Sequence, residues 1–299
     1  MVLNLHGEVP SSAATNTCVL NAEPAFLPHL RALHARFPRL RIVLEHATTR
    51  AAVECVKSLG DTVACTITAH HLALTVDDWA GQAWHFCKPV AKYPDDRAAL
   101  QAVVREGSSL FQPVHPPTLP SRARAGLQWP PALTCSASPP PGAHSLPHLH
   151  PHPPRTSLHS RPPISFRVRA GHPRFFLGSD SAPHPYRSKA GATPAEGCAA
   201  GVYTSPILLP LVAHLLESFG ALPRLEGFAS AHGRAFYGRP AAGDGDATAR
   251  RVTLRRAAAD SVVGIEGYGA GETHVVPFWA GKHIGWEIAE EGEAAAPAP

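Results

Sequence analysis

Three short motifs in the chain contain side chains that bind metal ions, and each motif follows an apolar run. His6 lies in Leu-His-Gly-Glu, His46 lies in Leu-Glu-His-Ala-Thr-Thr, and Asp180 lies in Gly-Ser-Asp-Ser-Ala-Pro-His. Neutral imidazoles and a carboxylate are typical ligands of a catalytic zinc ion. The pattern therefore predicts a metal site built from the ends of three strands.

The segments around these motifs alternate between strand and helix patterns. Apolar residues recur at three- and four-residue spacing over residues 23–37, which indicates an amphipathic helix. The predicted order is strand 2–5, helix 23–37, strand 41–45, helix 50–59, strand 63–67, a long loop to residue 94, helix 95–106, strand 174–178, helix 206–219 capped by Ser205, helix 224–235 and short strands after residue 252. This alternation indicates an α/β fold with a parallel sheet. In such a fold the three motifs would open into loops at one edge of the sheet.

Together the motifs resemble those of dihydroorotases of the single-function type found in bacteria and fungi, within the amidohydrolase superfamily. That family has His-Gly-Glu after strand five, Glu-His-x-Thr-Thr after strand six and Gly-x-Asp-Ser-Ala-Pro-His after strand eight, and this chain has all three in that order. Residues 86–92, Phe-Cys-Lys-Pro-Val-Ala-Lys, resemble the fungal form of the strand-seven loop. The resemblance covers residues 1–107 and 172–290. It implies the C-terminal half, strands five to eight, of a TIM-type (β/α)8 metallo-hydrolase barrel.

The resemblance also implies an activity and a set of roles. The reaction would be the zinc-dependent, reversible hydrolysis of the cyclic amide of (S)-dihydroorotate to N-carbamoyl-L-aspartate, in de novo pyrimidine (UMP) biosynthesis. His6 and His46 would bind the more buried of two zinc ions, and Asp180 would bind the other. Asp180 would also be the catalytic residue that delivers a proton to the leaving nitrogen. The residues expected to contact the substrate are His6, Lys88, His184 and Ala200.

Several ligands of the family pattern have no counterpart before His6. The family adds a His-x-His on strand one, an Arg and an Asn that hold the substrate, and a carboxylated Lys on strand four that bridges the two zinc ions. We therefore expect strands one to four to be missing and the chain to be inactive by itself. Neither His148-Leu-His150-Pro-His152 nor His70-His71 is predicted to replace these ligands, because the first lies in a proline-rich tract and the second in a polar loop.

Two other classes of function stay open. The first is another cyclic amidohydrolase, such as a hydantoinase or allantoinase, which is disfavoured because those enzymes lack the Asp-Ser-Ala-Pro-His string. The second is a non-catalytic remnant that uses a basic proline-rich arm for interactions.

The proline-rich tract, residues 108–171, differs in composition from the rest of the chain. It contains 15 of the 32 prolines, six of the 19 histidines and six arginines, with no Asp, Glu or Lys. Proline lacks a backbone donor and has a fixed φ, so we expect this tract to be disordered. We interpret it as translated intron sequence, with a genuine interaction arm as the alternative. The tail 291–299 is also expected to be disordered.

Composition limits the remaining function classes. The net charge of +4 comes from the tract, so it does not predict a nucleic-acid partner for the folded part. The sequence has no uninterrupted apolar run of membrane-spanning length and no signal pattern at its start, and its six cysteines lack disulfide or zinc-finger spacing. We therefore expect reduced thiols, a cytoplasmic location, a small-molecule substrate and no membrane partner. Family members are often homodimers.

Overall fold

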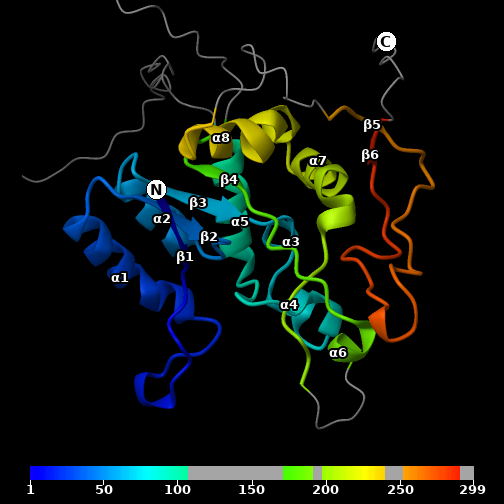
Figure 1. The fold of residues 1–299 in the computed structure, drawn as a ribbon, viewed down its shortest axis with the longest axis horizontal. Coiled ribbons are helices and arrows are strands. Elements are labelled where there is room, and N and C mark those ends of the chain that lie inside the picture. Colours follow the sequence, from blue (N-terminus) through cyan, green and yellow to red (C-terminus); the bar gives the residue numbers. More distant parts are fainter. Residues whose placement is uncertain (107–170, 191–196, 240–251, 290–299) are drawn as a thin grey trace, which may run out of the picture. The chain divides into compact units, whose positions relative to one another are not determined.

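The described residues form an α/β structure around a four-stranded parallel sheet (Figure 1). This computed structural model describes residues 1–106, 171–190, 197–239 and 252–289. The tract predicted to be disordered, residues 108–171, lies outside the described residues except for Gly171, which is buried; the tail 291–299 lies outside them entirely, so both stay predictions. No helix within the described ranges has the length and apolar character needed to cross a lipid bilayer.

The elements follow one another as strand and helix. The parallel strands are β1 (Val2–His6), β2 (Arg41–Glu45), β3 (Val63–Ile67) and β4 (Phe175–Leu177), in that order across the sheet. The α-helices are α1 (Ala22–Arg36), α2 (Arg50–Ser58), α3 (Ala69–Ala73), α4 (Val76–Trp79), α5 (Pro94–Arg105), α6 (Tyr186–Ala190), α7 (Leu208–Ser218) and α8 (His232–Phe236). Short 3-10 helices lie at Ala13–Thr15, Ala83–His85, Ser205–Ile207, Leu222–Arg224 and Gly271–Thr273, and a π-helix spans Gly227–Ala231. An antiparallel pair, β5 (Leu254–Arg256) and β6 (Trp286–Ile288), follows near the C-terminus.

The predicted strands and the long helices are confirmed, but three local predictions were wrong. The segment 68–93 contains α3 and α4 where a loop was predicted. Ser205 does not cap a helix, because it is itself the first residue of the 3-10 helix Ser205–Ile207. The Ser205 N–H donates to the Ser181 hydroxyl at 2.9 Å. The predicted helix 224–235 is not α-helical throughout, because Gly227–Ala231 form a π-helix between α-helical residues 225–226 and α8.

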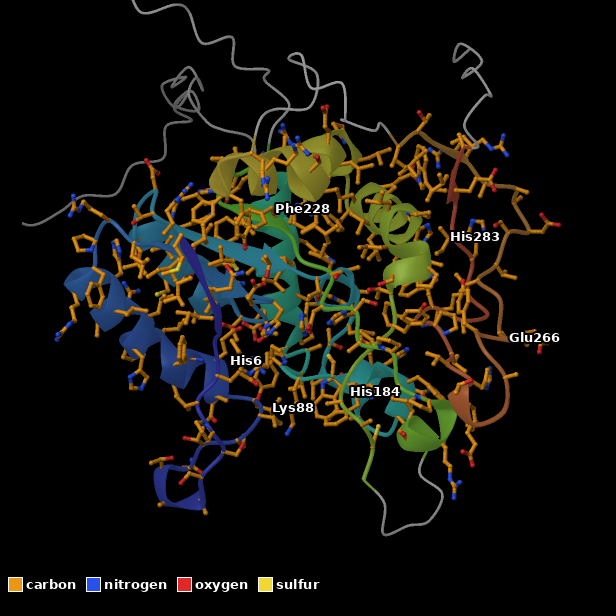
Figure 2. All side chains as sticks on the ribbon, viewed as in Figure 1. His6, Lys88, His184, Phe228, Glu266 and His283 are labelled. Carbon is orange, nitrogen blue, oxygen red and sulfur yellow. The ribbon has the colours of Figure 1, made fainter. Side chains whose placement is uncertain are left out.

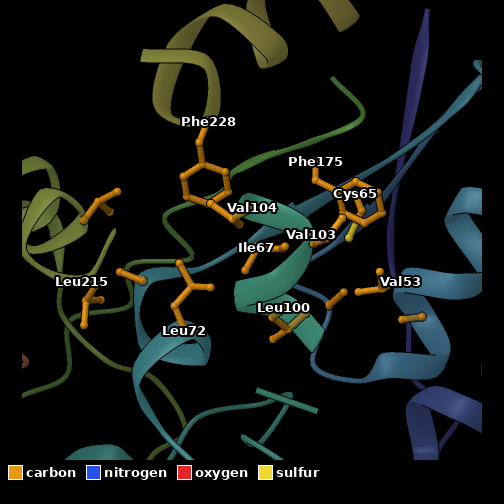
Figure 3. Packing of buried hydrophobic residues seen from close by; sticks show 14 of the residues in the cluster. Val53, Cys65, Ile67, Leu72, Leu100, Val103, Val104, Phe175, Leu215 and Phe228 are labelled. Atoms are coloured by element: carbon orange, nitrogen blue, oxygen red, sulfur yellow. The ribbon is translucent and has the colours of Figure 1, made fainter. Parts of the chain in front are cut away.

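One face of the sheet carries the main hydrophobic core, because alternate strand residues point toward the helices (Figure 3). Ile42 and Leu44 of β2, Cys65 and Ile67 of β3, and Phe175 of β4 are all buried on this face. They pack against apolar side chains of α1, α2, α5 and α7. The helices are thus attached to the sheet through this face.

The intervening strand residues point to the opposite face, which has a different character. Val43, Ala64 and Phe176 form a small second cluster there with Phe236 of α8. Toward the carboxyl ends of the strands, the same alternation places polar residues on this face. These residues are Asn4, His6, Glu45 and Thr66.

The chain segments on either side of the proline-rich tract meet directly. β3 pairs with β4, so that Cys65 lies opposite Phe175. The Arg174 guanidinium next to β4 donates to the carbonyl oxygens of Val56 and Gly60, at 2.6 and 2.7 Å. The parallel sheet is therefore continuous across the interruption in sequence.

The position of Leu44 gives a test of this packing. Leu44 is fully buried on the helix-facing side of β2, so Leu44→Ala should lower the free energy of unfolding by about 2–5 kcal/mol. Urea unfolding followed by tryptophan fluorescence measures this change. Ile288→Ala is the control, because Ile288 is 52% exposed and its truncation should change stability by no more than about 0.5 kcal/mol. Equal effects of the two substitutions would contradict the assigned core.

Candidate functional site

A polar cavity of about 340 Å³ lies at the carboxyl ends of the strands, on the face opposite the main core. It brings together His6, His46 and Asp180, the three residues that the sequence predicts as metal ligands. The remaining lining residues are Asn4, Glu45, Thr66, Gly178 and Ser179. Strands β1, β2 and β4 therefore deliver their terminal side chains to one place, as a parallel sheet requires.

The two histidines of the cavity face each other. β1 and β2 pair so that His6 lies opposite Glu45, which places His46 one residue beyond the pair. The His6 Nδ1 and His46 Nε2 atoms are 3.2 Å apart. Two nitrogen ligands of one tetrahedral zinc ion are separated by about 3.3 Å, given zinc–nitrogen bonds of about 2.0–2.1 Å. The two rings are therefore already spaced as neighbouring ligands.

His46 is held in its neutral form. Burial, and then the neighbouring His6, lower the pKa of His46 to about 4. The imidazole is uncharged at neutral pH, which is the form that binds a metal. Its Nδ1 atom is buried and has no hydrogen-bond partner among the described residues.

His46 and Asp180 share an uncommon backbone conformation. Both have φ of 39°, in the left-handed region that non-glycine residues rarely adopt. His46 follows β2 directly, and Asp180 lies three residues after β4; both residues line the cavity at this edge of the sheet. Strained residues of this kind persist where neighbouring groups hold them, and they gather at functional sites.

Thr66 of β3 is the group that holds this corner of the cavity. Its hydroxyl accepts a hydrogen bond from the His46 N–H at 2.7 Å and donates one to Glu45 Oε2 at 2.7 Å. A Cβ atom on Gly178 would lie 2.7 Å from the Thr66 Cβ, so only glycine allows β4 to approach so closely. The sequence analysis did not identify Thr66, because a threonine inside a strand usually indicates no more than β propensity.

Asp180 lies at the rim of the cavity. Partial desolvation raises the pKa of its carboxyl group, the charge of His6 lowers it, and the charge of Glu45 raises it again. Both His6 and Glu45 line the same cavity as Asp180.

Charged groups beneath the cavity orient His6. The Glu8 Oε2 atom lies 3.5 Å from His6 Nε2, on the opposite side of the ring from His46. The fully buried Lys92 ammonium binds Glu8 Oε1 at 3.2 Å and the Val19 carbonyl at 2.6 Å. A carboxylate on the outer nitrogen of a histidine fixes its ring orientation and favours metal binding by the inner nitrogen.

Glu23 of α1 supports the loop after His46 in a similar way. Its buried carboxylate accepts hydrogen bonds from the Thr48 N–H, at 2.8 Å, and from the Thr49 hydroxyl. Thr49 also caps α2 by accepting from the Ala52 N–H at 3.0 Å. Burial raises the pKa of Glu23, and the hydrogen bonds from both threonines oppose that shift.

The predicted substrate contacts lie in two places. Lys88 lines a neighbouring cavity of about 260 Å³ that also contains His6 and Glu8, and Figure 2 shows Lys88 near His6. His184 and Ala200 bind each other, with His184 Nε2 at 2.9 Å from the Ala200 carbonyl oxygen. Neither of these two residues lines the two cavities described.

Lys189 of α6 ties the loops of this region together. Its buried ammonium donates to the carbonyl oxygens of Phe86, Ala199 and Gly201, at 2.8, 2.9 and 2.8 Å. Phe86 lies two residues before Lys88, and Ala199 and Gly201 flank Ala200, so one side chain connects both loops. The sequence analysis missed Lys189, because a lysine after a polar loop resembles a surface charge.

Comparison with known proteins places the chain in a family. A dihydroorotase from Mycosarcoma maydis is 42% identical over 96% of this chain, and one from Saccharomyces cerevisiae is 32% identical over 96%. The chain belongs to the dihydroorotase family. It spans 66% and 63% of the length of these two relatives. No protein-family profile matches the chain.

Solved structures agree with membership in the dihydroorotase family. The Saccharomyces cerevisiae dihydroorotase, crystallised with 5-fluoroorotic acid, matches 97% of this chain with a TM-score of 0.68 and 32% identity, and the match covers 63% of that structure. A dihydroorotase from Campylobacter jejuni matches 97% with a TM-score of 0.62 and 25% identity, over 61% of its length. An L-hydantoinase from Arthrobacter aurescens shares only the fold, with a TM-score of 0.57 and 13% identity.

The contacts of Lys189 predict a large effect on stability. Lys189→Met should leave three carbonyl groups without their charged donor and lower the free energy of unfolding by about 3 kcal/mol. Amide hydrogen exchange should accelerate at Ala199 and Gly201. Lys57→Met removes one partly exposed ion pair with Glu106 and is expected to cost no more than about 1 kcal/mol. Unchanged exchange in the Lys189 variant would contradict the assigned role.

Proposed function

We propose that this chain supplies one side of a dihydroorotase active site, which interconverts (S)-dihydroorotate and N-carbamoyl-L-aspartate in pyrimidine biosynthesis. The observation that carries the proposal is the approach of His6 Nδ1 and His46 Nε2 to 3.2 Å in the cavity that also contains Asp180. The two most similar relatives described above are both named dihydroorotase, which supports the choice of reaction.

We further propose that the four β/α units are strands five to eight of a (β/α)8 barrel. The supporting observation is the difference between the two sheet faces. Helices α1, α2, α5 and α7 cover the face that carries Ile42, Leu44 and Ile67. The opposite face has one small cluster, which includes Phe236 of α8, and the polar cavity. In a (β/α)8 barrel the helices also lie on one face, and the other face lines the interior.

Zinc is the proposed metal, and the donor atoms fit it. His6 and His46 would hold one ion through Nδ1 and Nε2, and the Asp180 carboxylate would hold the second. The His6 Nδ1 and His46 Nε2 atoms face each other at 3.2 Å, close to the separation of neighbouring ligands of one zinc ion, which supports a cation bound by both. When bound, zinc would polarise the amide carbonyl and activate a water molecule.

Asp180 is the proposed proton carrier. Its carboxylate accepts a proton from the attacking water and delivers it to the ring nitrogen that leaves when the amide bond breaks. Partial desolvation raises the pKa of Asp180, which makes the protonated form easier to reach during this transfer. In the reverse direction the same carboxylate removes the proton from the nitrogen that closes the ring.

His184 is the proposed contact for the substrate carboxylate. The Ala200 carbonyl can only accept, so His184 Nε2 carries a proton in their 2.9 Å hydrogen bond. A carboxylate could then bind at Nδ1 only if the ring is doubly protonated. Lys88 lines the neighbouring cavity with His6, where its ammonium group would supply a positive charge for the substrate. The Ala200 backbone completes the proposed contacts.

Three ligands are fewer than the family pattern requires, so we expect no turnover from this chain alone. The bridging carboxylated lysine and the His-x-His pair have no equivalents in the cavity as described.

Homodimerisation and a cytoplasmic location stay predictions. The five cysteines in the described ranges are free, as the predicted reduced thiols require.

An assay with a complementing fragment tests the proposed function. The part of the Mycosarcoma maydis relative that this chain does not cover should be fused to the chain, and the consumption of dihydroorotate should be followed with zinc present. We expect turnover by the fusion protein. Asp180→Asn should lower kcat by about 10²–10⁴-fold, because the proton carrier is lost. His184→Ala should mainly raise KM, because it removes a substrate contact.

Two results would contradict this assignment. If the Asp180→Asn fusion kept the kcat of the wild-type fusion, Asp180 would not be the proton carrier. Hydrolysis of hydantoin or allantoin in place of dihydroorotate would retain the fold and the metal but overturn the substrate.

A further inference from the structure

A second group of metal-binding side chains lies outside the candidate active site. His70 and His71 occupy the first turn of α3, directly after β3, and Cys87 lies in the loop before Lys88. All three side chains are buried, with exposures of 0%, 1% and 2%. The cavities described above include none of these three residues.

The donor atoms of this group are close enough for one ion. One ring nitrogen from each histidine and the Cys87 sulfur all lie within 4.8 Å of one another. His71 Nε2 is 3.8 Å from Cys87 Sγ, and the Pro89 carbonyl oxygen is 2.9 Å from the first and 3.2 Å from the second. Neighbouring ligands of a tetrahedral zinc ion are about 3.3–3.7 Å apart, given its usual bond lengths. His71 Nε2, Cys87 Sγ and the Pro89 carbonyl oxygen therefore already have nearly that spacing.

His70 provides a separate indication of a missing partner. Both of its ring nitrogens are buried, and neither has a hydrogen-bond partner among the described residues. Its neighbour His71 is different, because its Nδ1 binds the Thr68 hydroxyl at 2.7 Å and its Nε2 binds the Pro89 carbonyl. Buried polar groups without partners are rare in folded proteins. A cation at the cluster would take the free lone pair of the His70 ring.

We propose that His70, His71 and Cys87 bind a zinc ion, with the Pro89 carbonyl oxygen as the fourth ligand. Nitrogen and thiolate donors favour zinc over magnesium or calcium, which prefer oxygen. The group is closed by protein on all sides, which is typical of a structural zinc site. The proposal does not depend on the proposed function.

The protons balance within the observed contacts. Zinc displaces the Cys87 thiol proton, which leaves to solvent. The Nε2 proton of His71, which now points at Pro89, moves to Nδ1 by a change of tautomer. The Thr68 hydroxyl oxygen, 2.7 Å away, then accepts a hydrogen bond from that nitrogen.

The ion would connect two parts of the candidate active site. α3 continues from β3, which carries Thr66, and Cys87 immediately precedes Lys88. Among the described residues, the Cys87 sulfur has only weak hydrogen-bond contacts, to His71 Nε2 at 3.8 Å and to the Pro89 carbonyl oxygen at 3.2 Å. A zinc ion would replace them with coordination bonds that join α3, through His70 and His71, to the loop that contains Cys87.

Cobalt substitution tests the proposal on the full chain, because a thiolate ligand gives cobalt(II) an intense near-ultraviolet charge-transfer band. We expect this band when the metal-free chain is titrated with cobalt, and added zinc should bleach it. Cys87→Ser should abolish the band, and His70→Gln should lower cobalt affinity by roughly tenfold or more. Cys65→Ser, a buried cysteine outside the cluster, and His46→Ala, a ligand of the other site, should both keep the band.

Two results would overturn the proposal. Cobalt that binds without the band, or a band that survives in Cys87→Ser, excludes Cys87 as a ligand. If Cys87→Ser does not fold, X-ray absorption at the zinc edge of the wild-type chain decides. One equivalent of zinc with a sulfur neighbour at about 2.3 Å supports the site, whereas zinc with only nitrogen and oxygen neighbours contradicts it.

Discussion

The pairing of β1 with β2 is the constraint on which the candidate active site depends. The register places His6 opposite Glu45, so His46 follows at the sheet edge and turns back over it. The left-handed conformation of His46 is strained, and the Thr66 hydroxyl and the buried Glu23 hold the loop in that shape. A slip of one residue in this register would move His6 to the opposite face of the sheet.

Buried ammonium groups stabilise the surrounding loops in the same manner. Lys92 binds Glu8 and the Val19 carbonyl beneath His6, and Lys189 binds three carbonyl groups beside Lys88 and Ala200. Loops have no ladder of their own, so their carbonyl groups need donors from elsewhere. A lysine with three donors satisfies several carbonyl groups at once, and this fixes loops that come from distant parts of the sequence.

The sequence predicted the elements that depend on local pattern, and it missed the groups that depend on contacts across the fold. The strands ending at His6, Glu45 and Ile67 follow from apolar runs. The motifs after β1, β2 and β4 contain His6, His46 and Asp180, which line one cavity; their role as metal ligands stays a prediction. Thr66, Glu23 and Lys189 have no local signature, because their partners lie 10 or more residues away in the sequence.

The pair His70-His71 is a second case in which the local sequence did not reveal contacts made across the fold. The sequence analysis assigned these residues to a polar loop with no metal role, whereas they lie on the buried helix α3 beside Cys87. Nothing near residue 70 indicates that residue 87 returns to it. The Thr68 cap, which accepts from the His71 N–H at 3.2 Å, is the one local sign of a helix start.

The central claim is that His6 and His46 bind the same metal ion. A crystal of the zinc-loaded chain, with an anomalous-difference map recorded at the zinc absorption edge, tests it most directly. We predict a peak about 2.0–2.1 Å from both His6 Nδ1 and His46 Nε2. A zinc-loaded crystal with no peak between these two nitrogens, or with zinc bound to the outer Nε2 of His6, would contradict the account.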